Sequence, residues 1–433
     1  MRIAQLAPLT ESVPPKLYGG TERVVSWLSD ELVNMGHDVT LFASGDSVTR
    51  ATLVPVWPRA LRLSRPRPDP ATACASLLEA IAGKAASFDV IHAHLDWVHL
   101  PLLRRLGVPF LTTLHGRLDL PNLELMTQCF PDAPFVSISQ NQRKPLPSAN
   151  WIGTIHHGLP PNLLRFSRQP GDYLAFLGRV TPEKGLDVAI RIARAVGVPL
   201  RIAAKIPTAG NRYFNETIKP LLDGDNVKFV GEITDREKQP FLGGALALLF
   251  PIDWPEPFGL VMIEAMACGT PVIAWSRGSV PEVIEEGISG FIVSSEAEAV
   301  AAIDRVRHLD RRRVRAAFNR RFTARRMARD YVDSYHMLTT GSRSTTTGHS
   351  AKAFPLRQNS KAPTDGMAQS SERGQPVSVS PIEGRSLSDG HLRRLGNGAK
   401  EGRRIKIAQQ GGPERVSGRP HSLRQRPATE NRS

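Results

Sequence analysis

Two glutamates frame an almost wholly apolar run in the stretch WPEPFGLVMIEAMACGTPVIA, residues 254–274. Glu256 precedes this run and Glu264 lies inside it. Burying an acid among apolar side chains is costly unless a partner binds it. The stretch therefore raises the question of what these two carboxylates hold.

A helix that begins at Phe258, Gly259 and Leu260, directly after a strand and a turn, would place free backbone amides beside Glu256. Such amides bond phosphate or sugar oxygens. Glu256 would offer acceptor oxygens to ligand hydroxyls, and Glu264, two turns into the helix, would accept from a diol such as a ribose. Each carboxylate–hydroxyl bond contributes about 1.5–3 kcal/mol. A solvent-facing Glu264 is disfavoured, because its helix neighbours are apolar.

Two cations stand at the end of another expected strand, in LGRVTPEKG, residues 177–185. Arg179 and Lys184 flank a turn that Pro182 and Gly185 shape. Cations at the carboxyl end of a strand suit a diphosphate, either bound or departing. The alternative is a pair of solvated surface charges.

The stretch YGGTERVV, residues 18–25, indicates a loop followed by a helix. Gly19 and Gly20 would let a ligand approach the backbone, and Thr21 can cap the helix, whose start favours an anion. Gly-Gly before a helix is also common for structural reasons. No G-x-G-x-x-G occurs there, so the dinucleotide fingerprint is missing.

A histidine also ends an expected strand, in TTLHG, residues 112–116. His115 would face the same ligand space and could bond a sugar or move a proton. A purely structural histidine is the alternative.

The elements that position these residues alternate along the chain, which is typical of parallel α/β sheets. In the first half the expected strands are 3–8, 38–44, 89–94, 109–115, 134–139 and 151–158, with a helix over 21–35. In the second half they are 172–178, 200–205, 227–233, 247–252, 271–275 and 290–293. The helices expected between them are 186–196, 214–222, 235–245, 258–268 and 296–309. The fold class is thus α/β, with two doubly wound Rossmann-like domains facing a central cleft.

The expected domain limits follow from this series. An N-terminal Rossmann-like domain covers 1–160, and a C-terminal Rossmann-like domain covers 161–325. A terminal helix over 326–340 packs back on the first domain, and 341–433 forms a disordered basic tail. Residues 160–162, Pro-Pro-Asn, are the expected hinge.

Most of the excess positive charge lies in that tail. The chain of 433 residues carries a net charge of +15, and residues 341–433 hold 17 Lys/Arg against 7 Asp/Glu. The tail is poor in apolar residues and cannot bury enough surface to fold. It could touch RNA or an anionic lipid surface, or be a solvated extension without a partner, which we favour. No specific nucleic acid is expected.

The three cysteines, far apart and without a CxxC, predict neither a disulfide framework nor a zinc site and favour a reducing compartment. The opening MRIAQLAP is interpreted as a strand rather than a signal peptide. The expected location is the cytoplasm, with weak peripheral contact at the inner membrane surface as an option.

From Met1 to about Leu338 the chain resembles glycosyltransferase family 4, the retaining nucleotide-sugar enzymes of GT-B fold. The resemblance rests on YGGTER, on His115 in TLHG, on GRVTPEKG, and on the Glu-seven-residues-Glu pattern from Glu256 to Glu264. The last two, in that order and spacing, are quite specific.

The resemblance implies a role for each of these residues. Gly19 and Gly20 would lie against the donor diphosphate or sugar, and His115 would contact the sugar near the reacting carbon. Arg179 and Lys184 would neutralise the leaving diphosphate. Glu256 would bind sugar hydroxyls beside the amides of Phe258, Gly259 and Leu260, and Glu264 would bind the ribose. FVGEI, residues 229–233, with Glu232 and Ile233, would edge the base pocket.

The implied reaction moves a sugar from a nucleotide-diphosphate sugar to an acceptor hydroxyl with retained anomeric configuration. It needs no metal or other cofactor, because Arg179 and Lys184 supply positive charge. The acceptor would be a sugar, a lipid-linked molecule or a small molecule. The alternatives are a nucleotide-sugar epimerase of the same architecture, or a nucleic-acid-binding protein acting through the tail.

Two further patterns are weighed and set aside. His92, His94, Asp96 and His99 suggest a metal site, but the first two share one strand face. Asp223-Gly224-Asp225 imitates a metal-binding DxD and is interpreted as an Asp-Gly turn. One departure from the family pattern is His157, in IHHGLP, where an asparagine is common.

Overall fold

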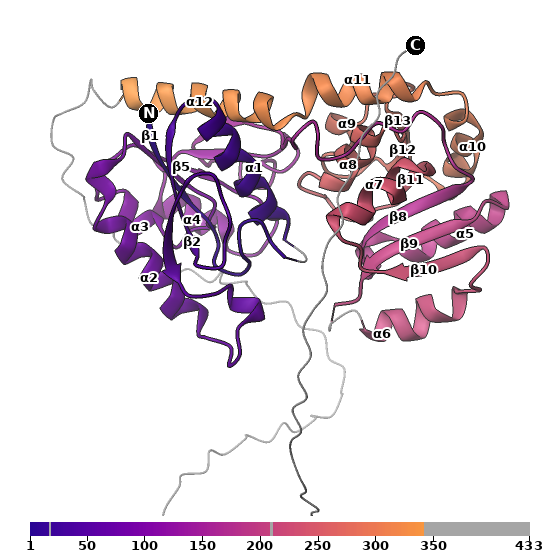
Figure 1. Ribbon diagram of the computed structural model, residues 1–433, viewed down its shortest axis with the longest axis horizontal. Helices are drawn as coiled ribbons and strands as arrows, with labels where there is room; N and C mark the ends of the chain where they lie inside the picture. The colour runs from indigo at the N-terminus through magenta and orange to yellow at the C-terminus, as the bar shows by residue number, and fades with distance from the viewer. Residues whose placement is uncertain (17–18, 208–210, 342–433) are drawn as a thin grey trace, which may run out of the picture. The chain divides into compact units, whose positions relative to one another are not determined.

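The computed structural model describes residues 1–16, 19–207 and 211–341, which contain two parallel β-sheets flanked by helices (Figure 1). The predicted tail, 341–433, lies outside the described residues except for Gly341, which ends the last helix. We call the part built on the first sheet the first lobe and the part built on the second sheet the second lobe. Both lobes fall within one compact unit of the chain.

The first sheet has the order β3-β2-β1-β4-β5-β6-β7, and all its strand pairs are parallel. Its strands are β1 (Arg2–Leu6), β2 (Asp38–Ser44), β3 (Thr52–Trp57), β4 (Val90–Ala93), β5 (Phe110–Thr113), β6 (Phe135–Ser137) and β7 (Trp151–Thr154). Its helices are α1 (Gly20–Asn34), α2 (Pro70–Ala82), α3 (Leu100–Leu103) and α4 (Leu123–Cys129). The order reverses beside β1, as in doubly wound folds.

The second sheet has the order β10-β9-β8-β11-β12-β13, again parallel throughout. Its strands are β8 (Tyr173–Arg179), β9 (Leu200–Lys205), β10 (Val227–Gly231), β11 (Ala245–Phe250), β12 (Val272–Trp275) and β13 (Gly290–Val293). The helices that follow them are α5 (Leu186–Val196), α6 (Asn211–Tyr213), α7 (Asp235–Gly243), α8 (Leu260–Cys268), α9 (Val280–Val283), α10 (Glu296–Val306), α11 (Arg311–Arg321) and α12 (Ala324–Gly341). The prediction of two doubly wound domains is confirmed.

Some local predictions were wrong. The expected helix over 214–222 is a π-type turn, Phe214–Ile218, followed by a 3-10 turn, Lys219–Leu221, because Pro220 has no amide to continue an α-helix. Neither β3 nor α2 was predicted. β3 contains Pro55, which an edge strand tolerates, and α2 begins with a capping Asp69 whose side chain accepts from the Thr72 amide.

The chain crosses between the lobes twice, and the two crossings are hydrogen-bonded to each other. The Leu159 amide donates to the Phe322 carbonyl at 3.0 Å, and the Ala324 amide donates to the Leu159 carbonyl at 2.9 Å. Leu159, the residue directly before the predicted hinge at 160–162, is therefore paired with the segment that joins α11 to α12.

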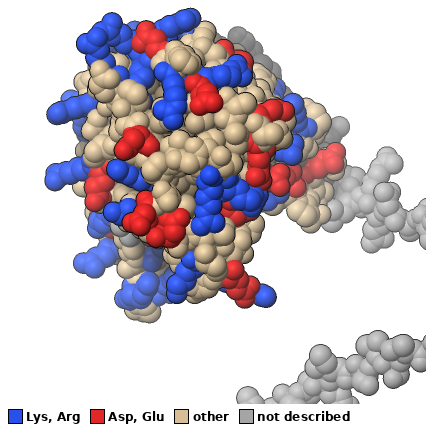
Figure 2. Space-filling model, turned by 90° about the vertical axis from the view of Figure 1, so that its right-hand side faces the viewer, with Lys and Arg blue, Asp and Glu red and all other residues tan. Residues whose placement is uncertain are grey.

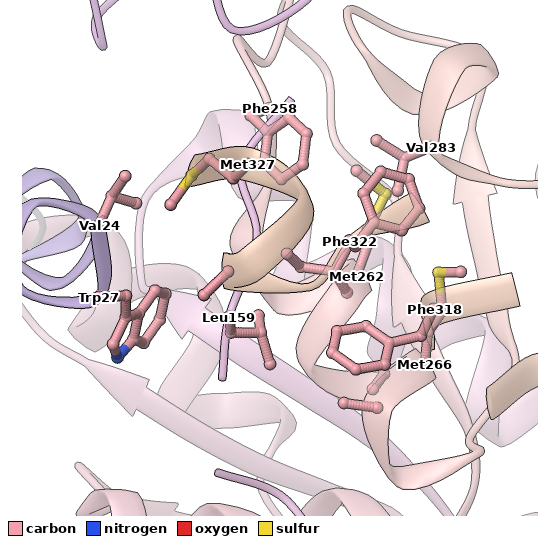
Figure 3. Close-up of a cluster of buried hydrophobic side chains, with 14 of the residues drawn as sticks. Val24, Trp27, Leu159, Phe258, Met262, Met266, Val283, Phe318, Phe322 and Met327 are labelled. Atoms are coloured by element: carbon pink, nitrogen blue, oxygen red, sulfur yellow. The ribbon is translucent and has the colours of Figure 1, made fainter. Parts of the chain in front are cut away.

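An apolar cluster lies around these crossings (Figure 3). Trp27 of α1 comes from the first lobe, Met262 of α8 from the second, and Leu159 and Phe322 from the crossings. Because side chains from both lobes pack in one cluster, the starts of α1 and α8 are held by a shared core.

Helix α12 follows the second lobe in sequence but packs on the first. Its Tyr331 and Tyr335 are fully buried, the Tyr335 hydroxyl accepts from Gln5 of β1, and Arg325 pairs with Glu31 of α1. The first sheet is thus covered partly by the last described helix.

Charges of both signs are interspersed on the face shown in Figure 2, rather than gathered into one basic patch. Among the described residues, no helix is both long enough and apolar enough to cross a membrane.

We expect Arg311→Met to lower the free energy of unfolding by about 3 kcal/mol, because it leaves buried carbonyls unpaired. The buried Arg311 guanidinium donates to the carbonyls of Ser167, Ala245 and Gly243 at 2.8–2.9 Å. Urea denaturation measures the loss. The exposed neighbour is the control: Arg312→Met should change stability by less than about 0.5 kcal/mol. Equal effects of the two variants would contradict this account of α11.

Candidate active site

Glu256, in the turn between β11 and α8, is held by two donors. The Lys184 ammonium, from the turn after β8, pairs with Glu256 Oε2, and Trp254 Nε1 donates to the same oxygen at 2.9 Å. The Lys184 ammonium also lies 4.8 Å from the centre of the Trp254 ring. Since the two charged side chains are only 12% and 13% exposed, this is a largely desolvated ion pair.

Glu264, in the second turn of α8, is buried, as its apolar neighbours predicted. Lys238 Nζ donates to Glu264 Oε1 at 2.6 Å from α7, and it lies 3.5 Å from Asp235. Sequence reasoning missed Lys238. Its position one turn into a helix gives no signal until α7 and α8 are known to be neighbours. Each of the two glutamates is therefore matched by a lysine from another element.

The starts of α1 and α8 meet across the lobes. Leu260 is the first residue of α8 and Gly20 the first of α1, and a Cβ atom built on Gly20 would lie 3.7 Å from the Leu260 side chain. A Cβ atom built on Gly19 would lie 2.9 Å from Pro15 Cβ and 2.8 Å from Glu22 Oε2, so a side chain there would displace its neighbours. The N-termini of two helices, whose first amides have no partner within their own helix, therefore lie beside one another.

Arg23 of α1 adds a polar contact at the same meeting point, because it pairs with Asp235 of α7. Asp235 in turn neighbours Lys238, the partner of Glu264. The first lobe is thus linked by charge to the elements that hold Glu264.

Arg179 ends β8, where the register with β9 sets it opposite Lys205. Its guanidinium lies 3.8 Å from Glu183, in the same turn as Lys184. Lys205 was not among the predicted residues. Both strands end at the same edge, so the cationic edge holds Arg179, Lys184 and Lys205.

The residues predicted to edge a base pocket lie just before α7. Glu232 is exposed, and Ile233 packs against the shared apolar cluster. This segment leads directly into α7, whose Lys238 contacts Glu264. Phe258 is buried, and Gly259 precedes α8 in a left-handed conformation, with φ of 76°.

His115 lies just after β5 and is part of a row of aromatic rings. Its ring stacks on His157 with centroids 5.2 Å apart, and His157 meets the edge of Phe258 at 4.9 Å. Burial lowers the pKa of His115 to about 3, so the imidazole is neutral at neutral pH. The histidine at position 157, where the family commonly has asparagine, thus joins His115 to the start of α8.

The histidines once weighed as metal ligands have other partners. His92 bonds Tyr335 and Thr113, and His99 Nε2 lies 2.7 Å from Thr112 Oγ1. Over the part of the chain that the structure describes, no group of three or more His, Cys, Asp or Glu is arranged to hold a metal ion. Asp223 forms the predicted turn, since its Oδ1 accepts from the amides of Asn226 and Val227.

A pocket of about 220 Å³ borders the site, with walls from both lobes. Arg117, Asp119 and Lys144 line it from the first lobe, and Pro255 and Pro257 line it from the second. The Arg117 guanidinium also lies 5.6 Å from the Trp254 ring centre, which connects the pocket to the Glu256 turn.

Two family models match the chain, and together they span 18–321. The model described as Glycosyltransferase Family 4 matches residues 18–175, and the model described as Glycosyl transferases group 1 matches residues 166–321. They support glycosyl transfer and give no support to the epimerase or nucleic-acid alternatives.

Sequence relatives agree with these models. A D-inositol 3-phosphate glycosyltransferase of Mycolicibacterium vanbaalenii is 25% identical over 337 residues, covering 64% of this chain and 74% of that protein. An uncharacterized glycosyltransferase of Methanocaldococcus jannaschii is 24% identical over 355 residues, covering 70% and 88%.

Solved structures share the fold. A glycosyltransferase involved in avilamycin A biosynthesis superposes with a TM-score of 0.61 at 26% identity, over 78% of this chain and 98% of that one. The Anabaena protein HepE, solved with UDP-glucose, gives 0.61 at 18% identity, over 78% and 100%. The two-lobed architecture is therefore the GT-B fold.

We expect Gly278→Ala to destabilise the protein by at least about 2 kcal/mol more than Gly287→Ala. Both glycines have a left-handed φ, 56° and 70°, so both variants share the backbone strain. Only at Gly278 would the new Cβ meet the Glu256 backbone, 2.3 Å from its amide nitrogen and carbonyl oxygen; at Gly287 it meets nothing within 4 Å. Urea denaturation of both variants measures the difference, and similar losses would show that Glu256 is not braced by Gly278.

Proposed function

Because the chain belongs to glycosyltransferase family 4 and has the GT-B fold, we propose that it transfers a sugar from a nucleotide-diphosphate sugar to an acceptor hydroxyl, with retention of anomeric configuration. The observation that carries the proposal is the pairing of two carboxylates, the buried Glu264 and the partly buried Glu256, with two lysines around the start of α8. Fixed charges of both signs suit a ligand that is anionic in its phosphates and rich in hydroxyls elsewhere.

The donor is proposed to bind with its diphosphate at the cationic edge. Arg179 and Lys184 would face the phosphates, assisted by the amides at the starts of α1 and α8. Glu256 would accept from sugar hydroxyls, and Glu264 from the ribose, while each keeps its lysine nearby. The fold likeness to HepE makes UDP-glucose the first donor to try.

In the proposed reaction the bond between the anomeric carbon and the phosphate oxygen breaks, and a bond to the acceptor oxygen forms on the same face. The acceptor proton passes to a phosphate oxygen of the departing nucleoside diphosphate. The extra negative charge on that group is stabilised by Arg179 and Lys184, which are in place before the reaction. The proposal therefore calls for no metal ion.

The acceptor is proposed to enter beside the first lobe, through the pocket lined by Arg117 and Lys144. A sugar, a lipid-linked molecule or a small molecule with a free hydroxyl would fit this proposal. From the sequence, we also propose a cytoplasmic location with weak contact at a membrane surface.

We expect one class of nucleoside diphosphate or nucleotide-sugar to raise the melting temperature of the protein, because a ligand that binds only the folded state stabilises it. Glu264→Gln should remove this shift, whereas the exposed control Glu79→Gln should keep it. A thermal-shift panel of nucleotides makes the measurement. If no nucleotide shifts the wild type, the donor assignment is wrong.

We expect Arg179→Met and Lys184→Met each to lower kcat by about 10²–10³, since each removes a cation from the leaving group. Lys228→Met, at an exposed position on β10, is the control. Product formation with an identified acceptor gives kcat, and NMR of the anomeric proton gives the stereochemistry. An inverted product would refute retention, and donor conversion without acceptor would favour an epimerase.

A further inference from the structure

A chain of hydrogen bonds between buried polar side chains runs from helix α12 to His115. Gln5 Nε2 donates to the Tyr335 hydroxyl at 3.1 Å, and Gln5 Oε1 lies 2.8 Å from His94 Nε2. His94 Nδ1 lies 2.9 Å from His115 Nε2. Tyr335, Gln5 and His94 are all at most 3% exposed, so water does not compete for these bonds.

This chain of hydrogen bonds determines which ring nitrogen of His94 and of His115 carries the proton. Burial lowers the pKa of His94 well below its usual value, so the ring is neutral, with one N–H and one bare nitrogen. Because Gln5 Oε1 only accepts, the His94 proton is on Nε2. The bare His94 Nδ1 then accepts, so His115 carries its proton on Nε2.

The remaining nitrogen, His115 Nδ1, is a bare acceptor. It is buried and has no hydrogen-bond partner among the described residues. Turning the Gln5 amide over would reverse every bond and place an unpaired N–H there instead. An orphaned buried N–H is the rarer arrangement, which supports the orientation described above.

His115 Nδ1 belongs to a ring that lies near the start of α8. The His115 ring stacks on His157, and His157 contacts Phe258, which precedes the start of α8. A sugar held there by Glu256 would present hydroxyls, which are donors as well as acceptors.

We propose that Gln5 and His94 are positioning residues, which hold the His115 proton on Nε2 so that Nδ1 accepts a hydrogen bond from a hydroxyl of the transferred sugar. This inference rests on the proposed function for the identity of its ligand. The Tyr335 hydroxyl also lies 2.8 Å from His92 Nδ1. When it donates its one proton to His92 Nδ1, it can only accept from Gln5, so Tyr335 holds the Gln5 amide in this orientation.

The tautomers can be read directly by NMR of protein labelled with 15N-histidine, because two-bond couplings distinguish Nε2–H from Nδ1–H. Signals are assigned with His94→Asn and His115→Asn. In the wild type we expect Nε2–H at both histidines. In Tyr335→Phe, which frees the Gln5 amide to turn, we expect a mixture of tautomers at His115, and about a tenfold lower kcat, the worth of roughly one hydrogen bond.

Tyr331→Phe is the matched control. It removes a hydroxyl from an equally buried tyrosine one turn away, bonded to Thr113 Oγ1 at 3.0 Å. That hydroxyl is joined to Tyr335 through Thr113 and His92, and its loss leaves the bonds from Tyr335 to Gln5 and from Gln5 to His94 in place. Tyr331→Phe should leave the His115 tautomer as in the wild type. If Tyr335→Phe does not fold, Gln5→Met removes the amide that bonds His94 Nε2 and so interrupts the same chain of hydrogen bonds.

A wild-type His115 with its proton on Nδ1 would overturn the inference, and so would a tautomer unchanged in Tyr335→Phe or Gln5→Met. UDP-glucose, or whichever nucleotide-sugar the thermal-shift panel shows to bind, should move the His115 Nδ1 signal, and the matching nucleoside diphosphate should not. Binding of that sugar nucleotide without the movement would refute the sugar contact. The tautomers are measured without catalysis, so this result does not depend on whether the proposed reaction occurs.

Discussion

Charge compensation around α8 is the constraint on which the site depends. A helix as apolar as α8 can carry Glu264 in its interior only because α7 brings Lys238 to it, and the turn before it can keep Glu256 only because Lys184 reaches across from β8. Removing one partner of such a pair leaves a buried charge unmatched, which costs far more than the pair contributes. The turn after β8 and helix α7 are thereby tied to the two carboxylates in and before α8.

The same constraint explains why ligand hydroxyls and phosphates could be received there without a large rearrangement. Preorganised charges do not need to turn toward a ligand, so their effect is not offset by reorganisation. The meeting of Gly20 with Leu260 and the pairing of Arg23 with Asp235 bring the first lobe to this prepared set.

Much of this was readable in the sequence. Strand ends carrying Arg179, His115 and the Glu256 turn could be located, because parallel sheets gather their carboxyl ends at one edge. The side chains that bond these residues could not be predicted from the sequence. Lys238 and Lys205 look like ordinary surface lysines in the sequence, and the bond from His94 to His115 requires the register of β4 beside β5. The strand β3 was missed because it contains a proline. The start of α2 could have been predicted, because Asp69-Pro70 is a typical helix start.

Helix α12 has a consequence for how the polypeptide is made. The first lobe leaves the ribosome early, yet Gln5 Nε2 and His92 Nδ1 both bond the hydroxyl of Tyr335, which is more than two hundred residues later in the chain. Domains commonly fold in the order of synthesis. The buried polar groups of the earlier lobe therefore stay incompletely hydrogen-bonded until helix α12 has been synthesised and has packed on the first sheet.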